Sequence, residues 1–286
     1  MPTTYAHWRF GCDCIETLPE NLKEVVHKHR ELFDIGVHGP DIFFYDLRHG
    51  DVVKYGYDTH YKPARDFFER AIKVYKENDE DKDAMLAYML GFLSHFTLDS
   101  QCHGFVDRKK EVSGISHNKV ESEYDAHLMR LDNKAVNRVK RAASLKPSKF
   151  TGRIMARFFP FDEETMYRTA RWQRMIIGAL VCRTNAKRMV LYRTMDKMNK
   201  LDYRDLLVMT KEADICKDSN LRLDKLKAFA LALYPELVED LMKAINEDKA
   251  IPEYFDHSFE RWPDYSEIPI LSYEEELKYE PEFRKK

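Results

Sequence analysis

Two segments space potential metal ligands four residues apart: His95-Phe96-Thr97-Leu98-Asp99-Ser100-Gln101-Cys102-His103 and His117-Asn118-Lys119-Val120-Glu121. Side chains at this interval on an α-helix lie on the same face. One helix over 82–105 therefore presents His95, Asp99 and His103 as a ladder, and a following helix presents His117 and Glu121. Imidazole and carboxylate groups are ligands that zinc accepts, at about 2.0–2.2 Å. Because five such groups exceed what one ion needs, the segments predict a cleft that holds more than one zinc ion.

The alternative for such histidines is a partly buried core residue or a solvated surface group. For His95 alone, that alternative is the more common case. It weakens for the whole set, because the surrounding residues are apolar and predict a helix that is buried on every side: Met85, Leu86, Tyr88, Met89, Leu90, Phe92, Leu93, Phe96 and Leu98. Burying Asp99 among them is costly unless it is paired or coordinates a metal. We therefore interpret the set as a metal centre.

The composition limits the class of protein. The chain has 286 residues, enough for a sizeable core, and its 47 basic and 49 acidic residues create no net field that selects nucleic acid. No stretch approaches the roughly 18–20 apolar residues of a membrane span, and the first residues lack the basic-then-apolar profile of a signal peptide. We expect a cytoplasmic protein, because the five scattered cysteines suit reduced, structural thiols: Cys12, Cys14, Cys102, Cys182 and Cys216.

Helical periodicity dominates the pattern, and there are only 10 glycines and few β-branched runs. The sequence predicts an all-α, multi-helical single domain with the zinc cleft between its central helices. Pro63 lies in the first turn of a helix that begins near Tyr61, and Ser116 suits the N-cap of the helix from His117. The predicted helices cover residues 20–33, 61–75, 82–105, 117–131, 162–199, 203–213 and 221–247.

Two segments depart from the average charge. Residues 134–161 contain eight basic residues and no acid, whereas the tail from 247 onward has twelve acids against six bases. We expect residues 1–246 to form the helical domain, with the motifs in 1–150, and the Pro- and aromatic-rich tail 247–286 to pack on it. The basic segment is either a solvated connector or a peripheral site for an anionic partner: lipid headgroups, a nucleic-acid backbone or the acidic tail itself.

Further potential ligands lie upstream, where the pattern predicts loops or helix starts. His60 lies just before a predicted helix, Asp41 lies in a turn after Gly39-Pro40, and His7 is close to the amino terminus. Each is a weak signal by itself, because turns are rich in Asp and helix starts often carry polar residues.

In their order and spacing, these residues resemble the zinc-dependent phospholipases C of bacteria. The wider superfamily includes single-strand-specific fungal nucleases and the N-terminal domain of glycosylphosphatidylinositol phospholipase D. The resemblance covers about residues 1–150. It is most specific in the segment Leu90-Gly91-Phe92-Leu93-Ser94-His95-Phe96-Thr97-Leu98-Asp99 and in 117–121.

The resemblance implies two zinc sites and allows a third. His60, His95 and Asp99 would hold the first zinc, and the second would be held by a set from both segments: His103, His117 and Glu121. The x3 interval before His103 is shorter than in the secreted enzymes, but on a helix it keeps that ligand in line.

The third site and the base depend on the upstream residues. His7, Asp99 as a bridge and the amino-terminal backbone would bind the third zinc, with Pro2 exposed by removal of Met1. Asp41 would be the general base or the carboxylate that positions the water.

The implied reaction is in-line hydrolysis of a phosphodiester, which releases an alcohol such as diacylglycerol and a phosphorylated headgroup. Phospholipid is the substrate that the family implies. A zinc nuclease or small-molecule phosphodiesterase is the alternative with the same metal centre, and only that reading takes nucleic acid as a partner. A non-catalytic metal-binding helical domain is the third reading. The chain lacks the adjacent His-Asp pair of His-Asp phosphohydrolases, and only Glu24-x-x-His27 fits the repeated motif of di-iron bundles.

Overall fold

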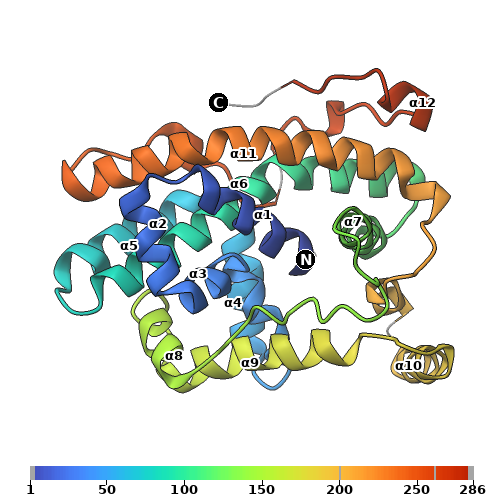
Figure 1. The fold of residues 1–286 in the computed structure, drawn as a ribbon, viewed down its shortest axis with the longest axis horizontal. Helices are drawn as coiled ribbons and strands as arrows, with labels where there is room; N and C mark the ends of the chain where they lie inside the picture. The colour runs from blue at the N-terminus through green and yellow to red at the C-terminus, as the bar shows by residue number, and fades with distance from the viewer. Residues whose placement is uncertain (1–3, 200, 261, 283–286) are drawn as a thin grey trace.

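The structure, a computed structural model of the chain, describes residues 4–199, 201–260 and 262–282, and within them every regular element is helical (Figure 1). The prediction of an all-α, multi-helical fold is confirmed. The α-helices are α1 (Thr4–Thr17), α2 (Glu20–Lys28), α3 (Arg30–Gly36), α4 (Gly50–Tyr61), α5 (Ala64–Glu77), α6 (Lys82–Ser113), α7 (His117–Leu131), α8 (Lys149–Ala156), α9 (Glu163–Ala179), α10 (Asn185–Lys197), α11 (Lys217–Asn246) and α12 (Tyr273–Glu276). The short 3-10 helices are η1 (Gly39–Tyr45), η2 (Leu201–Leu206), η3 (Asp214–Cys216), η4 (Glu253–Asp256) and η5 (Tyr265–Glu267).

Helix α6 forms the centre of the fold and carries the ligand ladder. Its side chains are buried almost continuously from Ala84 to Val106, as expected for a helix that is apolar on every side. Helix α11 runs beside it in Figure 1, and α1, α2, α3 and α5 pack against it as well. The helix continues past the predicted end at 105 and stops where Gly114 adopts a left-handed conformation (φ 70°). Contacts on all sides therefore fix the positions of the ladder residues.

A pair of glycines lets α3 approach α6 closely. A Cβ atom at Gly36 would lie 2.5 Å from the main-chain oxygen of Tyr88, and one at Gly91 would collide with the main-chain oxygen of Phe33. The two backbones therefore meet without intervening side chains. This contact holds the end of α3, and with it the start of η1, against the middle of α6.

The prediction of one helix over 20–33 is wrong, because the chain leaves helical geometry at His29 (φ −122°, ψ 41°). Helix α2 ends before this residue and α3 begins after it. The change of direction allows apolar residues on both sides of the break to be buried, since Val26 and Phe33 are each 0% exposed.

The helix expected to begin near Tyr61 begins instead at Ala64, because Pro63 has an extended backbone (ψ 135°). The residues before it form α4, which the sequence pattern did not reveal. Its buried positions recur every fourth residue at Val52, Gly56 and His60, and one of them is a glycine without a side chain. His60 thus lies in the last turn of a helix rather than before one.

The stretch 162–199 forms two helices rather than one. Helix α9 ends at Ala179, and α10 starts anew because the side chain of Thr184 accepts a hydrogen bond from the main-chain N–H of Lys187. The predicted helix over 221–247 is present as α11, which begins four residues earlier, at Lys217. The helix from His117 and its Ser116 cap are confirmed, because the Ser116 side chain accepts from the N–H of Lys119.

The predicted α-helix over 203–213 is wrong. The chain forms η2 there and then continues irregularly to 213. Its main-chain oxygens accept hydrogen bonds from arginine side chains instead of helical N–H groups: Arg141 binds the oxygen of Leu206, and Arg130 binds that of Met209. Tertiary contacts therefore replace the local helical bonds.

The chain after α11 returns along the ligand helix. Phe259 is fully buried, and the indole N–H of Trp262 donates to the main-chain oxygen of Ser100 on α6. Glu276 accepts two hydrogen bonds, at 2.7 and 3.0 Å, from the buried guanidinium of Arg222 on α11. These contacts bring residues from the end of the chain next to the ladder.

The glycine contact between α3 and α6 can be tested by a substitution that adds one methyl group. Gly91→Ala should lower the free energy of unfolding by about 1–3 kcal/mol, because the backbones must separate to admit it. Gly178→Ala is the matched control: it also lies in a helix, but a Cβ there meets nothing within 4 Å, so its stability should stay equal or rise by up to about 1 kcal/mol. Thermal and urea unfolding measure both, and equal effects would contradict the account.

Candidate metal centre

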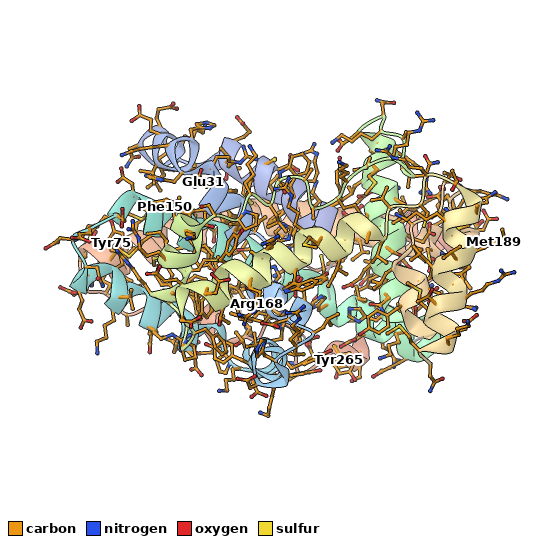
Figure 2. The ribbon with its side chains drawn as sticks, turned by 90° about the horizontal axis from the view of Figure 1, so that it is seen from below. Glu31, Tyr75, Phe150, Arg168, Met189 and Tyr265 are labelled. Atoms are coloured by element: carbon orange, nitrogen blue, oxygen red, sulfur yellow. The ribbon has the colours of Figure 1, made fainter. Side chains whose placement is uncertain are left out.

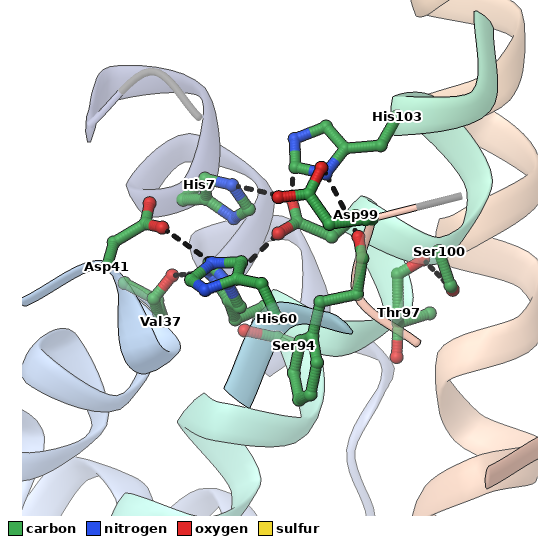
Figure 3. Close-up of polar contacts among 12 residues, drawn as sticks. His7, Val37, Asp41, His60, Ser94, Thr97, Asp99, Ser100 and His103 are labelled. Atoms are coloured by element: carbon green, nitrogen blue, oxygen red, sulfur yellow. Dashed lines mark hydrogen bonds and ion pairs between the residues drawn. The ribbon is translucent and has the colours of Figure 1, made fainter. Parts of the chain in front are cut away.

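The candidate ligands predicted from the sequence converge at the middle of α6. Figure 3 labels five of them: His7, Asp41, His60, Asp99 and His103. Helix α6 supplies three of them and α7 two, while α1, η1 and α4 each supply one. All except the partly exposed His117 are buried. Their ligand atoms form three groups, within each of which all atoms lie no more than 4.8 Å apart: Asp41, His60 and His95; His7, His95 and Asp99; His103, His117 and Glu121.

The first group joins η1, α4 and α6. The Nε2 atom of His60 lies 2.9 Å from Oδ1 of Asp41, and the rings of His60 and His95 meet edge to face at 6.1 Å. Gly39 makes this packing possible, because its φ of 47° turns η1 inward and a Cβ atom there would collide with the His95 ring. The turn that carries Asp41 therefore lies directly against the ligand ladder.

Asp99 lies at the centre of the site. Its Oδ1 atom is 3.0 Å from Nε2 of His7, and its Oδ2 atom is 3.0 Å from Nε2 of His95. Nε2 of His103 lies 3.8 Å from Oδ1. One carboxylate with a side chain only 2% exposed thus faces three imidazole rings. This is the arrangement of a carboxylate able to bridge neighbouring metal ions.

The third group joins α6 to α7. Oε1 of Glu121 lies 2.8 Å from Nε2 of His117 and 3.3 Å from Nε2 of His103. The side chain of His117 is 17% exposed, more than any other member of the three groups. Solvent therefore reaches the centre from the side of α7.

The groupings overlap with the expected sites without matching all of them. His103, His117 and Glu121 lie together as one group. His60, expected beside His95 and Asp99, is grouped with His95 and Asp41 instead, and Asp99 is grouped with His7 and His95. Asp41, expected as the base, therefore also lies within ligand distance of two histidines. The amino-terminal backbone expected at the third site lies outside the described residues.

Four of the histidines are oriented by contacts at the ring nitrogen that faces away from the groups. Nδ1 of His60 lies 2.7 Å from the oxygen of Gly56, that of His95 3.3 Å from the oxygen of Val37, and that of His103 2.9 Å from the oxygen of Phe259. A carbonyl oxygen only accepts, so Nδ1 carries the proton and donates. Nδ1 of His117 lies 3.2 Å from Oδ1 of Asp107. In each neutral ring, the Nε2 lone pair points inward, as metal-ligating histidines require.

The inward atoms fit a metal better than they fit one another. Nε2 of His95, Nε2 of His103 and Oδ2 of Asp99 are buried and have no hydrogen-bond partner among the residues that the structure describes. The two imidazole nitrogens nevertheless lie 3.0 and 3.8 Å from carboxylate oxygens of Asp99. Buried polar atoms are rarely left without a partner. Their chemistry, imidazole nitrogen and carboxylate oxygen, is that of a zinc site.

Without metal, the cluster holds protons. Burial alone lowers the pKa of His103, but the carboxylates of Asp99, Glu121 and Glu260 raise it to about 10. Burial alone raises the pKa of Glu121, but the neighbouring His117 and His103 hold it well below its usual value. Metal binding must therefore displace protons from this cluster.

Sequence analysis missed two residues that continue the four-residue spacing at both ladders. Asp107 follows His103 by four residues and contacts His117. Asp125 follows Glu121 by four residues, and its Oδ1 accepts a hydrogen bond of 2.8 Å from the main-chain N–H of Ala6. Asp125 thereby fixes the first turn of α1, which carries a candidate ligand in the next position. The same interval that revealed the ligands could have revealed both.

Phe259 is a third residue that sequence analysis missed. Its carbonyl oxygen binds His103, and its N–H donates to the main-chain oxygen of His60 at 3.2 Å. Its ring lies 5.9 Å from the rings of both His60 and His95. One residue of the tail therefore contacts histidines of two groups. Nothing in the local sequence around Phe259 signals this long-range contact.

Removing an outer partner tests the role of Asp107. Asp107→Asn weakens the contact that orients His117, so zinc affinity should fall about 10–100-fold, the usual effect of such partners. Competition with a chromogenic zinc chelator measures this. Asp13→Asn, in an ion pair of similar exposure outside the cluster, should bind zinc like the unmodified protein. Equal affinity in the Asp107 variant would rule out the role.

Proton displacement makes zinc stabilisation depend on pH. In the metal-free protein, the raised pKa of His103 contributes stability that is present below its unfolded value of 6.5 and is lost as the pH rises through about 10. Zinc needs the neutral ring, so the gain in thermal midpoint caused by zinc should grow between about pH 6.5 and 8.5. Paired melting curves with and without zinc measure the difference, and a gain that shrinks with pH would contradict this account.

Comparison with known proteins identifies the family. No curated protein matches the chain, and no solved structure does. No helix among the described residues is long and apolar enough to cross a membrane. A family model described as zinc dependent phospholipase C matches residues 6–160, which is more than half of the chain and includes every candidate ligand from His7 to Glu121. The chain therefore belongs to the zinc-dependent phospholipase C family.

Proposed function

We propose that this protein hydrolyses a phosphodiester bond of a phospholipid with the help of two zinc ions. The observation that carries the proposal is the buried Asp99 carboxylate, which faces imidazoles from three ligand groups at 3.0–3.8 Å. Membership of the zinc-dependent phospholipase C family supports the same chemistry.

We propose that the first zinc is held by His60, His95 and Asp99, with Asp41 beside it. The second zinc is held by a set from both helices: His103, His117 and Glu121. The short distances within His103, His117 and Glu121 support the second site, and the short distances of His95 to both His60 and Asp99 support the first. A third zinc would use His7 and Asp99, whose side chains lie 3.0 Å apart, together with the amino terminus. A cytoplasmic location stays a prediction that rests on the five free cysteines.

When bound, two zinc ions lower the pKa of a shared water and stabilise the attacking and leaving oxygens of a phosphodiester. The protein's own groups supply the rest. The carboxylate of Asp41 lies 2.9 Å from Nε2 of His60, a proposed ligand of the first zinc, so it is positioned to orient the water and accept its proton. The buried surroundings exclude bulk water and strengthen these electrostatic interactions. The partly exposed His117 marks the side from which the substrate approaches.

The metal and the chemistry can be separated by substituting two carboxylates. Asp99→Asn should remove most of the zinc and the activity, because it takes the charge from the centre of the cluster. Asp41→Asn keeps an oxygen atom that can bind a metal ion but removes the carboxylate that acts as the base. Zinc content should therefore stay the same, and turnover should fall about 10²–10⁴-fold. Asp34→Asn, a buried carboxylate paired with Arg30 at 2.7 Å outside the site, controls for loss of a buried charge.

Elemental analysis measures the zinc content of these variants, and hydrolysis of a chromogenic phosphodiester measures their turnover. The unmodified protein should carry two to three zinc ions per chain. Less than one zinc per chain, or an Asp99 variant that keeps its zinc, would rule out the proposed centre.

The substrate class needs a separate comparison. Phosphatidylcholine in mixed micelles should be cleaved to diacylglycerol and a phosphorylated headgroup, and single-stranded DNA should not be degraded at a comparable rate. Thin-layer chromatography and gel electrophoresis follow the two reactions in parallel. Faster cleavage of DNA would show that the protein is instead a zinc nuclease with the same metal centre.

A further inference from the structure

A long basic stretch lies on α9 and α10, after the segment that sequence analysis singled out. Residues 165–195, between Glu164 in the first turn of α9 and Asp196 in the last turn of α10, contain seven basic residues and no acid. In Figure 1, both helices lie along the lower edge of the molecule, and Figure 2, seen from that side, labels Met189 beside α10 at the edge of the molecule. The charge of this surface is therefore concentrated on two consecutive helices.

Several bases of the earlier segment, 134–161, are paired with acidic side chains of the fold. Arg141 pairs with Asp125, and Arg153 and Arg157 both pair with Asp81. The acidic tail meets other bases, as in the pair of Glu276 with Arg222. The ion pairs with Asp125 and Asp81 compensate part of the positive charge of 134–161.

The bases of α9 and α10 are less well compensated. Arg168 pairs with Asp46. Arg174, Lys187 and Arg188 instead donate to main-chain oxygens, at 2.8, 2.9 and 3.4 Å, which leaves their positive charge in place. Arg171 is exposed and lies over the ring of Tyr167. The surface is therefore a source of positive potential.

A groove on α9 adds a place for an anionic group. It has a volume of about 570 Å³, and Lys140, Arg171 and Arg174 line it together with Tyr167 and Met175. Its size is that of a pocket for one small ligand or lipid headgroup. The lining combines positive charge with an apolar side chain, since Met175 is 50% exposed.

Helix α10 combines the same two properties on its outward face. Every side chain of α10 is at least partly exposed, and Leu191, Tyr192 and Met195 rest on the body of the protein. Met189, Arg193 and Lys197 follow one another at intervals of four residues, with Val190 beside them, so they share the opposite face. Met189 is 55% and Val190 61% exposed. Exposed apolar residues interleaved with bases are typical of helices that lie in a membrane interface.

We propose that α9 and the outward face of α10 form a docking surface for an anionic lipid bilayer. A nucleic-acid backbone would match the charge but would leave Met175, Met189 and Val190 without an apolar environment. A second copy of the chain would bring two positive surfaces together, which is unfavourable. A bilayer with anionic headgroups satisfies both the charge and the apolar side chains. The inference rests on the proposed function in one respect: docking on a bilayer would bring the protein to its proposed phospholipid substrate.

Vesicle co-sedimentation of the full-length, zinc-loaded protein tests this surface. Vesicles of phosphatidylcholine and phosphatidylglycerol (7:3) should bind the protein more tightly than phosphatidylcholine alone, and 0.5 M NaCl should weaken the binding. Replacing two bases, Arg193→Gln with Lys197→Gln, should weaken it roughly 25-fold at low salt, at about fivefold for each charge. Met189→Ser with Val190→Ser should weaken it several-fold, because apolar insertion is lost.

Lys110→Gln with Val112→Ser is the matched control, because both residues are exposed near the end of α6; it should bind vesicles like the unmodified protein. All variants should keep their thermal midpoint, zinc content and rate on a soluble phosphodiester. Equal vesicle affinity of the α10 variants, no preference for anionic vesicles, or α10 substitutions that abolish DNA binding or self-association instead would each overturn the proposal. If vesicles bind as expected but no phosphodiester is cleaved, the proposed function fails while the docking surface stands.

Discussion

The buried carboxylate of Asp99 is the constraint on which the rest of the structure depends. A charge this deep in an apolar helix is unfavourable unless opposite charges or metal ions compensate it. The fold places three imidazoles within 3.0–3.8 Å of it. Two of these imidazoles have their own support: the glycine contact between α3 and α6 sets η1 against His95, and Asp125 fixes the first turn of α1, which carries His7. Long-range packing therefore serves one local electrostatic arrangement.

Orientation of the histidines links this arrangement to metal chemistry. Carbonyl oxygens of Gly56, Val37 and Phe259 each bind the outward nitrogen of a ring, so the opposite lone pair points into the cluster. The same cluster stores protons in the metal-free protein, as the raised pKa of His103 shows. Folding, proton release and metal binding are therefore coupled, because the groups that metal requires are the groups that the fold buries.

Features with a local cause were predictable from the sequence, and features with a distant cause were not. The apolar surroundings of the ladder predicted a buried central helix, and Ser116 predicted the start of α7; both are confirmed. Asp107 and Asp125 continue the same four-residue spacing, although neither was predicted as part of the site. The break at His29, the helix that carries His60 and the contact of Phe259 with two histidines depend on tertiary packing. No interval within one segment encodes such contacts.

Anomalous X-ray diffraction at the zinc edge, from crystals of the zinc-loaded protein, tests the central claim most directly. The account predicts one peak at bonding distance from His60 and His95 and a second from His103, His117 and Glu121, with the Asp99 carboxylate at the first. Zinc peaks confined to other residues, with the Asp99 carboxylate bound to no metal, would contradict it.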